Sequence, residues 1–211
     1  MAKRATKPAS QKSTRDRILD AAARILARQG MGATTTKRIA AEARLSEGSL
    51  YNHFKDRADL LIALVLERLP SIRQVFVELH NDAVPLPERL PKALAAMIAF
   101  YLRTQPFVAG IVSDPALLKL TRKRFDDSGQ GPHLAHEKLA ALLRAEQTRG
   151  HIRAGVSPEM IAALLIGACT EYASLYTMTG SKLGGLGSED YAASIIATLA
   201  PAIFPGGAAT A

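Results

Sequence analysis

The chain has 211 residues, 48% of them apolar, and a formal net charge of +8. Its length suits one small domain joined to a larger one, and no run approaches the roughly 18 uninterrupted apolar residues of a membrane span, so we expect a soluble protein. The single cysteine, Cys169, excludes an internal disulfide and a cysteine-based zinc site, and it fits a reducing compartment.

The excess positive charge lies in the N-terminal quarter of the chain. Residues 1–57 hold 13 Lys or Arg and 5 Asp or Glu, a balance of +8, whereas residues 58–211 hold 14 of each. Neutralised phosphates supply most of the non-specific affinity for nucleic acid, so this pattern is typical of a nucleic-acid reader. A disordered basic tail on an unrelated domain would give the same balance. Residues 1–12 lack hydrophobic periodicity, which predicts a disordered basic arm. They also lack the apolar core of a secretory signal, so we expect a cytoplasmic protein.

The hydrophobic pattern predicts an all-α fold of about nine helices. Apolar residues recur at intervals of three and four rather than two, and the sequence contains no Asn-Gly or Asp-Gly hairpin turn. Ser13 followed by Asp16 resembles a capping box, and the apolar stripe that starts at Ile18 stops at Gly30, a natural residue after a helix end. The first helix is therefore expected between these limits.

Two short helices are predicted next, joined by a three-residue turn. The first is expected over 36–43 with Thr35 as its cap, and the second over 47 to about 53 with Ser46 as its cap. Helices this short are not stable alone. They must pack on the first helix through apolar residues, which are Ile39, Ala40, Ala43, Leu45, Leu50 and Phe54.

A longer helix is predicted from Asp56 and Asp59 to about His80. Pro70 interrupts its apolar pattern, and because proline removes a backbone donor and clashes with the preceding turn, we expect a kink or a break near Leu69. We also expect a flexible link over 180–187 and a frayed tail over 205–211. The remaining helices are predicted at roughly 88–104, 107–125, 131–149, 158–179 and 188–203.

A helix, two short helices around a tight turn and a long connecting helix are the architecture of a helix-turn-helix DNA reader. The residues themselves resemble the N-terminal domain of the tetracycline-repressor (TetR) family. Residues 34–40 read TTTKRIA, residues 45–54 read LSEGSLYNHF, and Arg57 and Leu60-Leu61 follow. The match covers about residues 13–61 and includes polar and aromatic identities as well as apolar spacing.

The resemblance implies two domains and a mechanism. The DNA-binding domain extends over 13–58 with its helix-turn-helix at 35–54, and residues 59–204 form the ligand-binding and dimerisation domain. We expect a homodimer whose recognition helices lie about one DNA turn apart, roughly 34 Å, on a palindromic operator of double-stranded DNA. A small, largely apolar or aromatic effector then shifts the population of conformers and releases the DNA. Most relatives repress, so we expect a repressor; the alternatives are a TetR-like activator and an architectural DNA-binding protein without an effector.

The candidate DNA contacts lie in and around the two short helices. Thr35 and Thr36 stand at a helix N-terminus, where hydroxyls, backbone N–H groups and the helix dipole attract a phosphate, although a structural cap explains Thr35 equally well. Lys37 is placed to reach a guanine edge or a phosphate. Glu47 is placed to accept a hydrogen bond from cytosine, or only to complement the dipole. The full set comprises Thr35, Thr36, Lys37, Arg44, Glu47, Gly48, Ser49, Tyr51, Asn52, His53 and Arg57.

The recognition helix itself offers the remaining contacts. Gly48 and Ser49 let its backbone approach the DNA groove closely. By resemblance, Tyr51 and His53 contact phosphates on either side of the base-reading face, and Arg57 binds a backbone phosphate. Core packing is the alternative for Tyr51.

Arg44 occupies a turn position at which the family commonly has glycine. A non-glycine residue with positive φ carries a cost of about 1 kcal/mol. Either the turn is reshaped, or Arg44 accepts mild strain and its charge helps to bind DNA.

The last two predicted helices contain a candidate dimer interface. Small residues recur along 158–179 and permit close helix approach, and 188–203 carries a matching apolar stripe. We therefore expect a four-helix interface between two subunits. Its residues are Ala163, Gly167, Thr170, Ser174, Tyr191, Ile195, Leu199 and Ala202.

A ligand pocket is predicted between the middle helices. Cys169 and Glu171 are its polar candidates, although a plain core position is the more frequent outcome for any one of its residues. The candidate set is Met97, Phe100, Tyr101, Phe107, Ile111, Leu118, Cys169, Glu171, Tyr172 and Tyr176.

The sequence predicts no cofactor, metal, catalytic centre or membrane partner. His133, His136 and Glu137 lie at helical spacing, but two histidines and an acid near a helix start are more often solvated than metal-bound. The nucleophile arrangements, phosphate-binding glycine loops and paired carboxylates of enzymes are missing from the sequence. An enzyme with an incidental basic region is a further alternative.

Overall fold

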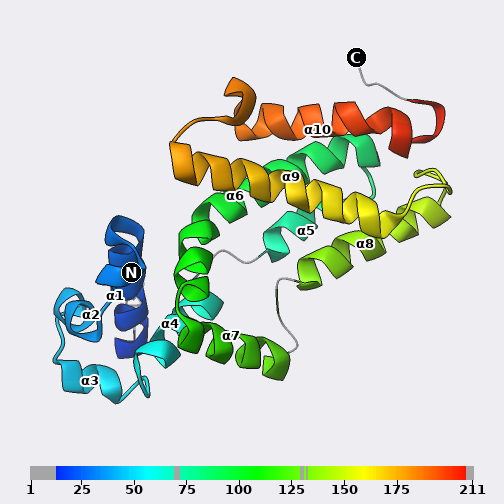
Figure 1. Ribbon diagram of the computed structural model, residues 1–211. Helices are drawn as coiled ribbons and strands as arrows, with labels where there is room; N and C mark the ends of the chain where they lie inside the picture. Colours follow the sequence, from blue (N-terminus) through cyan, green and yellow to red (C-terminus); the bar gives the residue numbers. More distant parts are fainter. Residues whose placement is uncertain (1–12, 69–71, 129–130, 132, 208–211) are drawn as a thin grey trace, which may run out of the picture. The chain divides into compact units, whose positions relative to one another are not determined.

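The computed structural model describes residues 13–68, 72–128, 131 and 133–207, and every regular element among them is helical (Figure 1). These residues form ten α-helices and three 3₁₀ turns, so the all-α prediction is confirmed. The chain divides into two compact units, Met1–Leu69 and Pro70–Ala211.

The first unit contains four α-helices, of which the first packs against the second and the fourth. Ser13 caps the first helix, since its Oγ accepts a hydrogen bond from the Asp16 N–H at 3.1 Å. Gly30 ends that helix with a φ of +76°, as its sequence position predicts. The elements are α1 (Thr14–Gln29), the 3₁₀ turn η1 (Met31–Ala33), α2 (Thr36–Ala43), α3 (Glu47–Tyr51) and α4 (Arg57–Arg68).

Burial of apolar side chains holds the short helices α2 and α3 in place. Ile39, Leu50 and Phe54 are each at most 2% exposed. The guanidinium of Arg15 on α1 lies over the Phe54 ring, 5.0 Å from its centroid. Because helices of this length are unstable in isolation, these contacts give them their stability.

The long helix predicted up to His80 is two helices. α4 ends at Arg68 and α5 (Arg73–Leu79) follows, with Pro70 itself outside the described residues. A break is what the proline predicts, and this division accounts for ten helices where about nine were expected.

The second unit is a bundle around the long helix α6 (Figure 1). α6 packs against α5, α7, α9 and α10, and α8 packs against α9. These helices, apart from α7, contribute to one core of buried apolar residues. The elements after α5 are α6 (Leu86–Val112), α7 (Pro115–Ser128), α8 (His133–Thr148), α9 (Pro158–Thr179), the 3₁₀ turn η2 (Leu183–Gly185), α10 (Ser188–Ile203) and the 3₁₀ turn η3 (Pro205–Gly207).

The predicted boundary between 104 and 107 is wrong, because α6 continues through Pro106 to Val112. A proline removes only one backbone donor, and the helix is held on both sides of it by burial of Thr104 and Ile111. The true boundary lies where Asp114 Oδ1 accepts hydrogen bonds from two backbone N–H groups at the start of α7, each at 3.1 Å.

The C-terminal end is ordered further than its composition suggests. Phe204 is 3% exposed, and its carbonyl accepts a hydrogen bond from Arg153 Nε at 3.0 Å. Residues 205–207 then form η3, while 208–211 lie outside the described residues. The tail predicted to fray from 205 is therefore a 3₁₀ turn over its first three residues.

Helices α6 and α9 are long and apolar enough, by length and composition alone, to count as candidate membrane spans. Core helices of soluble proteins meet the same criterion, and both helices contribute side chains to the core of the second unit.

Candidate nucleic-acid interface

Helices α2 and α3 are each capped by a hydroxyl and joined by a tight turn. Thr35 Oγ1 accepts a hydrogen bond from the Arg38 N–H at 3.3 Å, and Ser46 Oγ accepts one from the Ser49 N–H at 3.2 Å. Both predicted caps are confirmed. The cap leaves Thr35 exposed at the helix N-terminus, so the structural role does not remove it from the candidate phosphate site.

Arg44 adopts the left-handed conformation, with φ 57° and ψ 51°. Among the described residues it is the one non-glycine with positive φ. The turn is closed by a hydrogen bond from the Leu45 N–H to the Ala40 carbonyl at 2.9 Å. Of the two alternatives posed for Arg44, the strained residue is therefore the correct one, and its exposed side chain keeps its charge outside the core.

The recognition helix α3 places apolar side chains inside and polar tips outside. Leu50 is 0% exposed, whereas Tyr51 is 50% exposed, which excludes core packing for the tyrosine. Asn52 and His53 are exposed as well, and so is Lys37 on the first turn of α2. This arrangement leaves the candidate contacts free to meet a DNA groove.

Glu47 is oriented by a neighbour rather than only by the helix dipole. The Thr36 hydroxyl on α2 donates a hydrogen bond to Glu47 Oε1 at 2.6 Å. The bond links the starts of the two short helices and fixes the direction of the exposed carboxylate.

Gly48 has no internal packing reason to be glycine. A side chain at this position would meet only Ser46 Oγ, at 3.9 Å, and glycine is about 1 kcal/mol less favourable than alanine within a helix. Its lack of a side chain is consistent with close approach of the backbone to an external surface.

Arg57 has a structural role that the sequence did not indicate. Its Nε donates to the Thr34 carbonyl at 2.9 Å, and its Nη2 donates to the Met31 carbonyl at 3.2 Å. These bonds attach the start of α4 to the segment before α2. No local pattern could have shown this, because donor and acceptors lie more than 20 residues apart.

Comparison with known proteins identifies the family of this domain. Residues 18–64, which contain the caps, the strained turn and the exposed tips, match the family model of bacterial regulatory proteins, tetR family. This N-terminal domain is that of the tetR family of bacterial regulatory proteins. Its DNA-binding helix-turn-helix is thus shown by the family match as well as by the geometry.

Individual relatives and solved structures show the same similarity. The HTH-type transcriptional regulator YvkB of Bacillus subtilis is 36% identical over 69 residues, which are 33% of this chain and 36% of that protein. A solved TetR-family regulator from Mesorhizobium loti matches with a TM-score of 0.72 at 18% identity, covering 91% of this chain and 97% of that one. The complex of Stenotrophomonas maltophilia SmeT with triclosan matches with a TM-score of 0.66 at 19% identity, covering 93% and 94%. At such identities the two structures show the fold alone.

Several of the residues predicted to bind a ligand lie in the hydrophobic core of the second unit. Met97 and Cys169 are 0% exposed and Tyr172 is 3% exposed. The Cys169 thiol lies 3.7 Å from the Leu94 carbonyl, and the Tyr172 hydroxyl donates to the Leu186 carbonyl at 2.9 Å. Burial raises the pKa of Cys169 to about 12, so this thiol stays neutral.

The other predicted pocket residues differ widely in exposure. Phe100 and Tyr101 are half-buried and contact each other edge to face at 5.4 Å, and burial raises the pKa of Tyr101 to about 12. Glu171 and Tyr176 are exposed on α9. The remaining three are half-buried Phe107, buried Ile111 and half-buried Leu118, of which Leu118 lines a shallow groove along α7.

The outer side of α9 carries exposed apolar residues. Met160 and Leu164 are 61% and 56% exposed, and Gly167 follows them at helical spacing. A groove of about 390 Å³ runs between α9 and α10 and includes three predicted interface residues, which are Tyr191, Ile195 and Leu199.

The remaining predicted interface residues are placed less uniformly. Ala202 is exposed, whereas Ala163 and Thr170 are half-buried. Ser174 accepts a hydrogen bond from Gln105 Nε2 of α6 at 2.6 Å, so its hydroxyl is engaged within the unit. Met160 and Leu164 are the exposed residues that the small-residue pattern missed.

Proposed function

We propose that this regulator is a cytoplasmic homodimeric repressor that binds a palindromic operator and is released by a small, largely apolar or aromatic effector. The observation that carries the proposal is the α2–turn–α3 arrangement, in which buried Leu50 and Phe54 support exposed Lys37 and Tyr51. Two recognition helices presented by a two-fold dimer read two half-sites about one DNA turn apart.

The DNA contacts divide into those that position and those that specify. Thr35, Tyr51 and His53 suit phosphate oxygens, whereas Lys37 and Glu47 suit base edges in the major groove. The charge of Arg44 adds to the positive surface of this unit. Arg57 serves mainly to position α4, since its Nε and Nη2 are already bonded to backbone carbonyls.

The apolar side formed by α9 and α10 supports dimer formation. Met160 and Leu164 are large apolar side chains left in solvent in a single subunit, and burial against the same residues of a second subunit removes that cost. Replacing Leu164 by arginine should convert the dimer to monomer, as measured by light scattering after size exclusion. A dimer that persists in Leu164→Arg would place the interface elsewhere.

The relatives support a repressor that responds to an apolar ligand. SmeT is named as a repressor, and its structure with triclosan is that of a complex with a small aromatic compound. The core of the second unit here is rich in apolar and aromatic side chains, among them Phe100, Tyr101 and Tyr172.

Operator footprinting tests the DNA-binding part of the proposal. We expect a protected palindrome, and Lys37→Ala or Tyr51→Ala should each weaken operator binding by about 1–3 kcal/mol without changing the oligomeric state. Lys182→Ala, which removes an exposed lysine far along the sequence, is the matched control. Uniform protection without a palindrome would favour an architectural protein, and unchanged affinity in both variants would refute the assigned contacts.

A further inference from the structure

A groove of about 700 Å³ lies between α5 and α8 in the second unit. α5 packs on α6 and α8 packs on α9, so each helix is supported from behind while a hollow remains between them. Sites for small organic ligands occupy roughly 300–1,000 Å³. The groove is therefore large enough for a ligand, and none of its residues belongs to the pocket predicted from the sequence.

One part of the groove is apolar and uncovered. Phe76 and Leu79 of α5 are nearly buried in its wall, whereas Val77 is 63% exposed. Ala141 and Ala145, one turn apart on α8, are exposed and line the same hollow. Uncovered apolar side chains on two facing helices favour a ligand with an apolar body.

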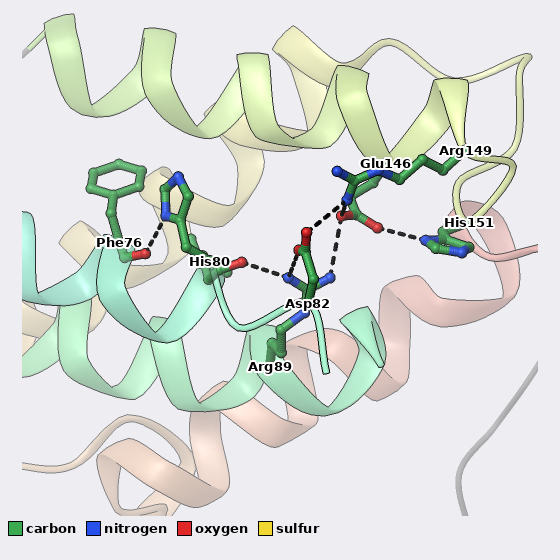
Figure 2. Close-up of polar contacts among 8 residues, drawn as sticks. Phe76, His80, Asp82, Arg89, Glu146, Arg149 and His151 are labelled. Carbon is green, nitrogen blue, oxygen red and sulfur yellow. Dashed lines mark hydrogen bonds and ion pairs between the residues drawn. The ribbon is translucent and has the colours of Figure 1, made fainter. Parts of the chain in front are cut away.

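The other part of the groove borders a network of charged side chains (Figure 2). Arg89, which is 4% exposed, donates to the Leu79 carbonyl at 2.6 Å and binds Asp82 at 3.1 Å and Glu146 at 3.2 Å. Glu146, itself 2% exposed, also binds Arg149 at 2.9 Å and His151 at 2.7 Å. The network thus connects the end of α5, the start of α6 and the end of α8.

The charged network and the groove lining together hold more cations than carboxylates. Burial opposes ionisation of Glu146, but hydrogen bonds and charges from His151 and Arg89 outweigh it and lower the pKa of Glu146, so the group is a carboxylate. Lys138 lines the groove and has no carboxylate partner in the part of the chain that the structure describes. Arg89, Arg149 and Lys138 against Asp82 and Glu146 make three positive and two negative charges, an excess of one with the histidines neutral.

His80 adds a polar group between the two parts. Its Nδ1 lies 2.5 Å from the Phe76 carbonyl (Figure 2). Because a carbonyl only accepts, Nδ1 carries the ring proton, and Nε2 has no protein partner among the described residues. The ring therefore has one nitrogen available to a ligand in the groove.

We propose that the groove between α5 and α8 binds an amphipathic organic anion. Its apolar body lies along Val77, Ala141 and Ala145, and its anionic head is bound by Lys138, the lining cation outside the charged network. An organic cation is disfavoured, because it would meet Lys138 while both carboxylates of the groove are already occupied. The site would hold the effector of the proposed repressor. Ligand binding itself does not depend on that proposal, and only the effect of the ligand on operator binding rests on it.

Titration calorimetry of the full chain with dodecanoate, in the absence of DNA, tests the site. Dodecanol and dodecyltrimethylammonium should each bind about tenfold or more weakly, because they lack the charge-assisted hydrogen bond of the carboxylate. Lys138→Gln should weaken dodecanoate binding about tenfold for the same reason. Ala141→Leu should also weaken it, because the larger side chain fills the apolar part of the groove.

Matched controls and a second readout decide the outcome. Lys182→Gln and Ala116→Leu change exposed residues outside the groove and should bind dodecanoate like the parent chain. Equal affinity in the parent, Lys138→Gln and Ala141→Leu would overturn the site, and so would equal affinity for dodecanoate and dodecanol. Operator binding is measured separately. A chain that binds dodecanoate in the groove but binds no operator would support the site and would refute only the proposal that the protein is a repressor.

Discussion

The two units of this regulator use arginine in opposite ways. In the first unit Arg44 is exposed on a strained turn, whereas in the second unit Arg89 is 4% exposed and bound to two carboxylates and a backbone carbonyl. A DNA-binding surface must leave its polar groups unsatisfied by protein, while a buried network must satisfy them internally. The chemistry of the first unit is therefore visible in residue identities, and that of the second depends on packing.

Phe54→Ala has the largest expected effect. It tests whether buried side chains of the first unit hold the fold while exposed ones contact DNA. Phe54 is 2% exposed beneath the Arg15 guanidinium, and its loss should lower the free energy of unfolding by about 4 kcal/mol and abolish operator binding. Thermal or urea unfolding followed by circular dichroism measures the change. Tyr51→Ala, at a 50% exposed neighbour, should lose operator affinity with little change in stability, and a comparable loss of stability in both would contradict the division into anchors and tips.

Glu146→Gln probes the second unit in the same way. The variant removes the buried carboxylate partner of Arg89 and leaves only the exposed Asp82, which should cost about 3 kcal/mol of unfolding free energy. Glu137→Gln, at an exposed position on the same helix, is the control and should change stability little.

The pH dependence of this difference gives a sharper test. The pKa of Glu146 is lowered in the folded chain, so its contribution is fully present above the ordinary value of 4.5 and is lost as the pH falls through the lowered pKa. The stability gap between parent and Glu146→Gln should therefore shrink below about pH 4.5. A gap that stays constant in acid would show that the carboxylate charge is not what stabilises the network.

The smallest expected effect is at the strained turn. Arg44→Gly removes the left-handed strain and should raise the free energy of unfolding by about 1 kcal/mol, while operator affinity falls because a cation is lost. Arg44→Asn, which tolerates this conformation, should give an intermediate stability with the same loss of affinity. A glycine variant that is no more stable than the parent would show that the turn is not strained.

The first unit could be predicted closely from sequence because its signals are local. The caps at Ser13, Thr35 and Ser46 each lie within three residues of the N–H group they bind, and the apolar spacing around them has one consistent helical period. Arg57 was the exception, since its partners lie in a turn that only the folded unit brings near.

The second unit was less predictable because distant contacts override local rules. Pro106 is a helix breaker by residue type, yet α6 continues past it since the buried face of the helix holds both sides. The dimer and pocket residues were chosen by helical spacing, which does not say how far a helix is rotated toward its neighbours. Helical spacing therefore did not indicate that Met160 and Leu164 are exposed, nor that the Ser174 hydroxyl accepts a hydrogen bond from Gln105 of the same unit.

By itself the sequence determined the all-α class, the helix limits near its caps, the division between α4 and α5, and which polar residues are candidates to contact DNA, because these depend on neighbours along the chain. Only the tertiary structure decided how Arg44 resolves its strain, where Arg57 binds, and that α5 and α8 enclose a groove beside a buried ion network. Those outcomes depend on how the backbone turns and on contacts between residues far apart in the sequence, and sequence spacing alone does not show such contacts.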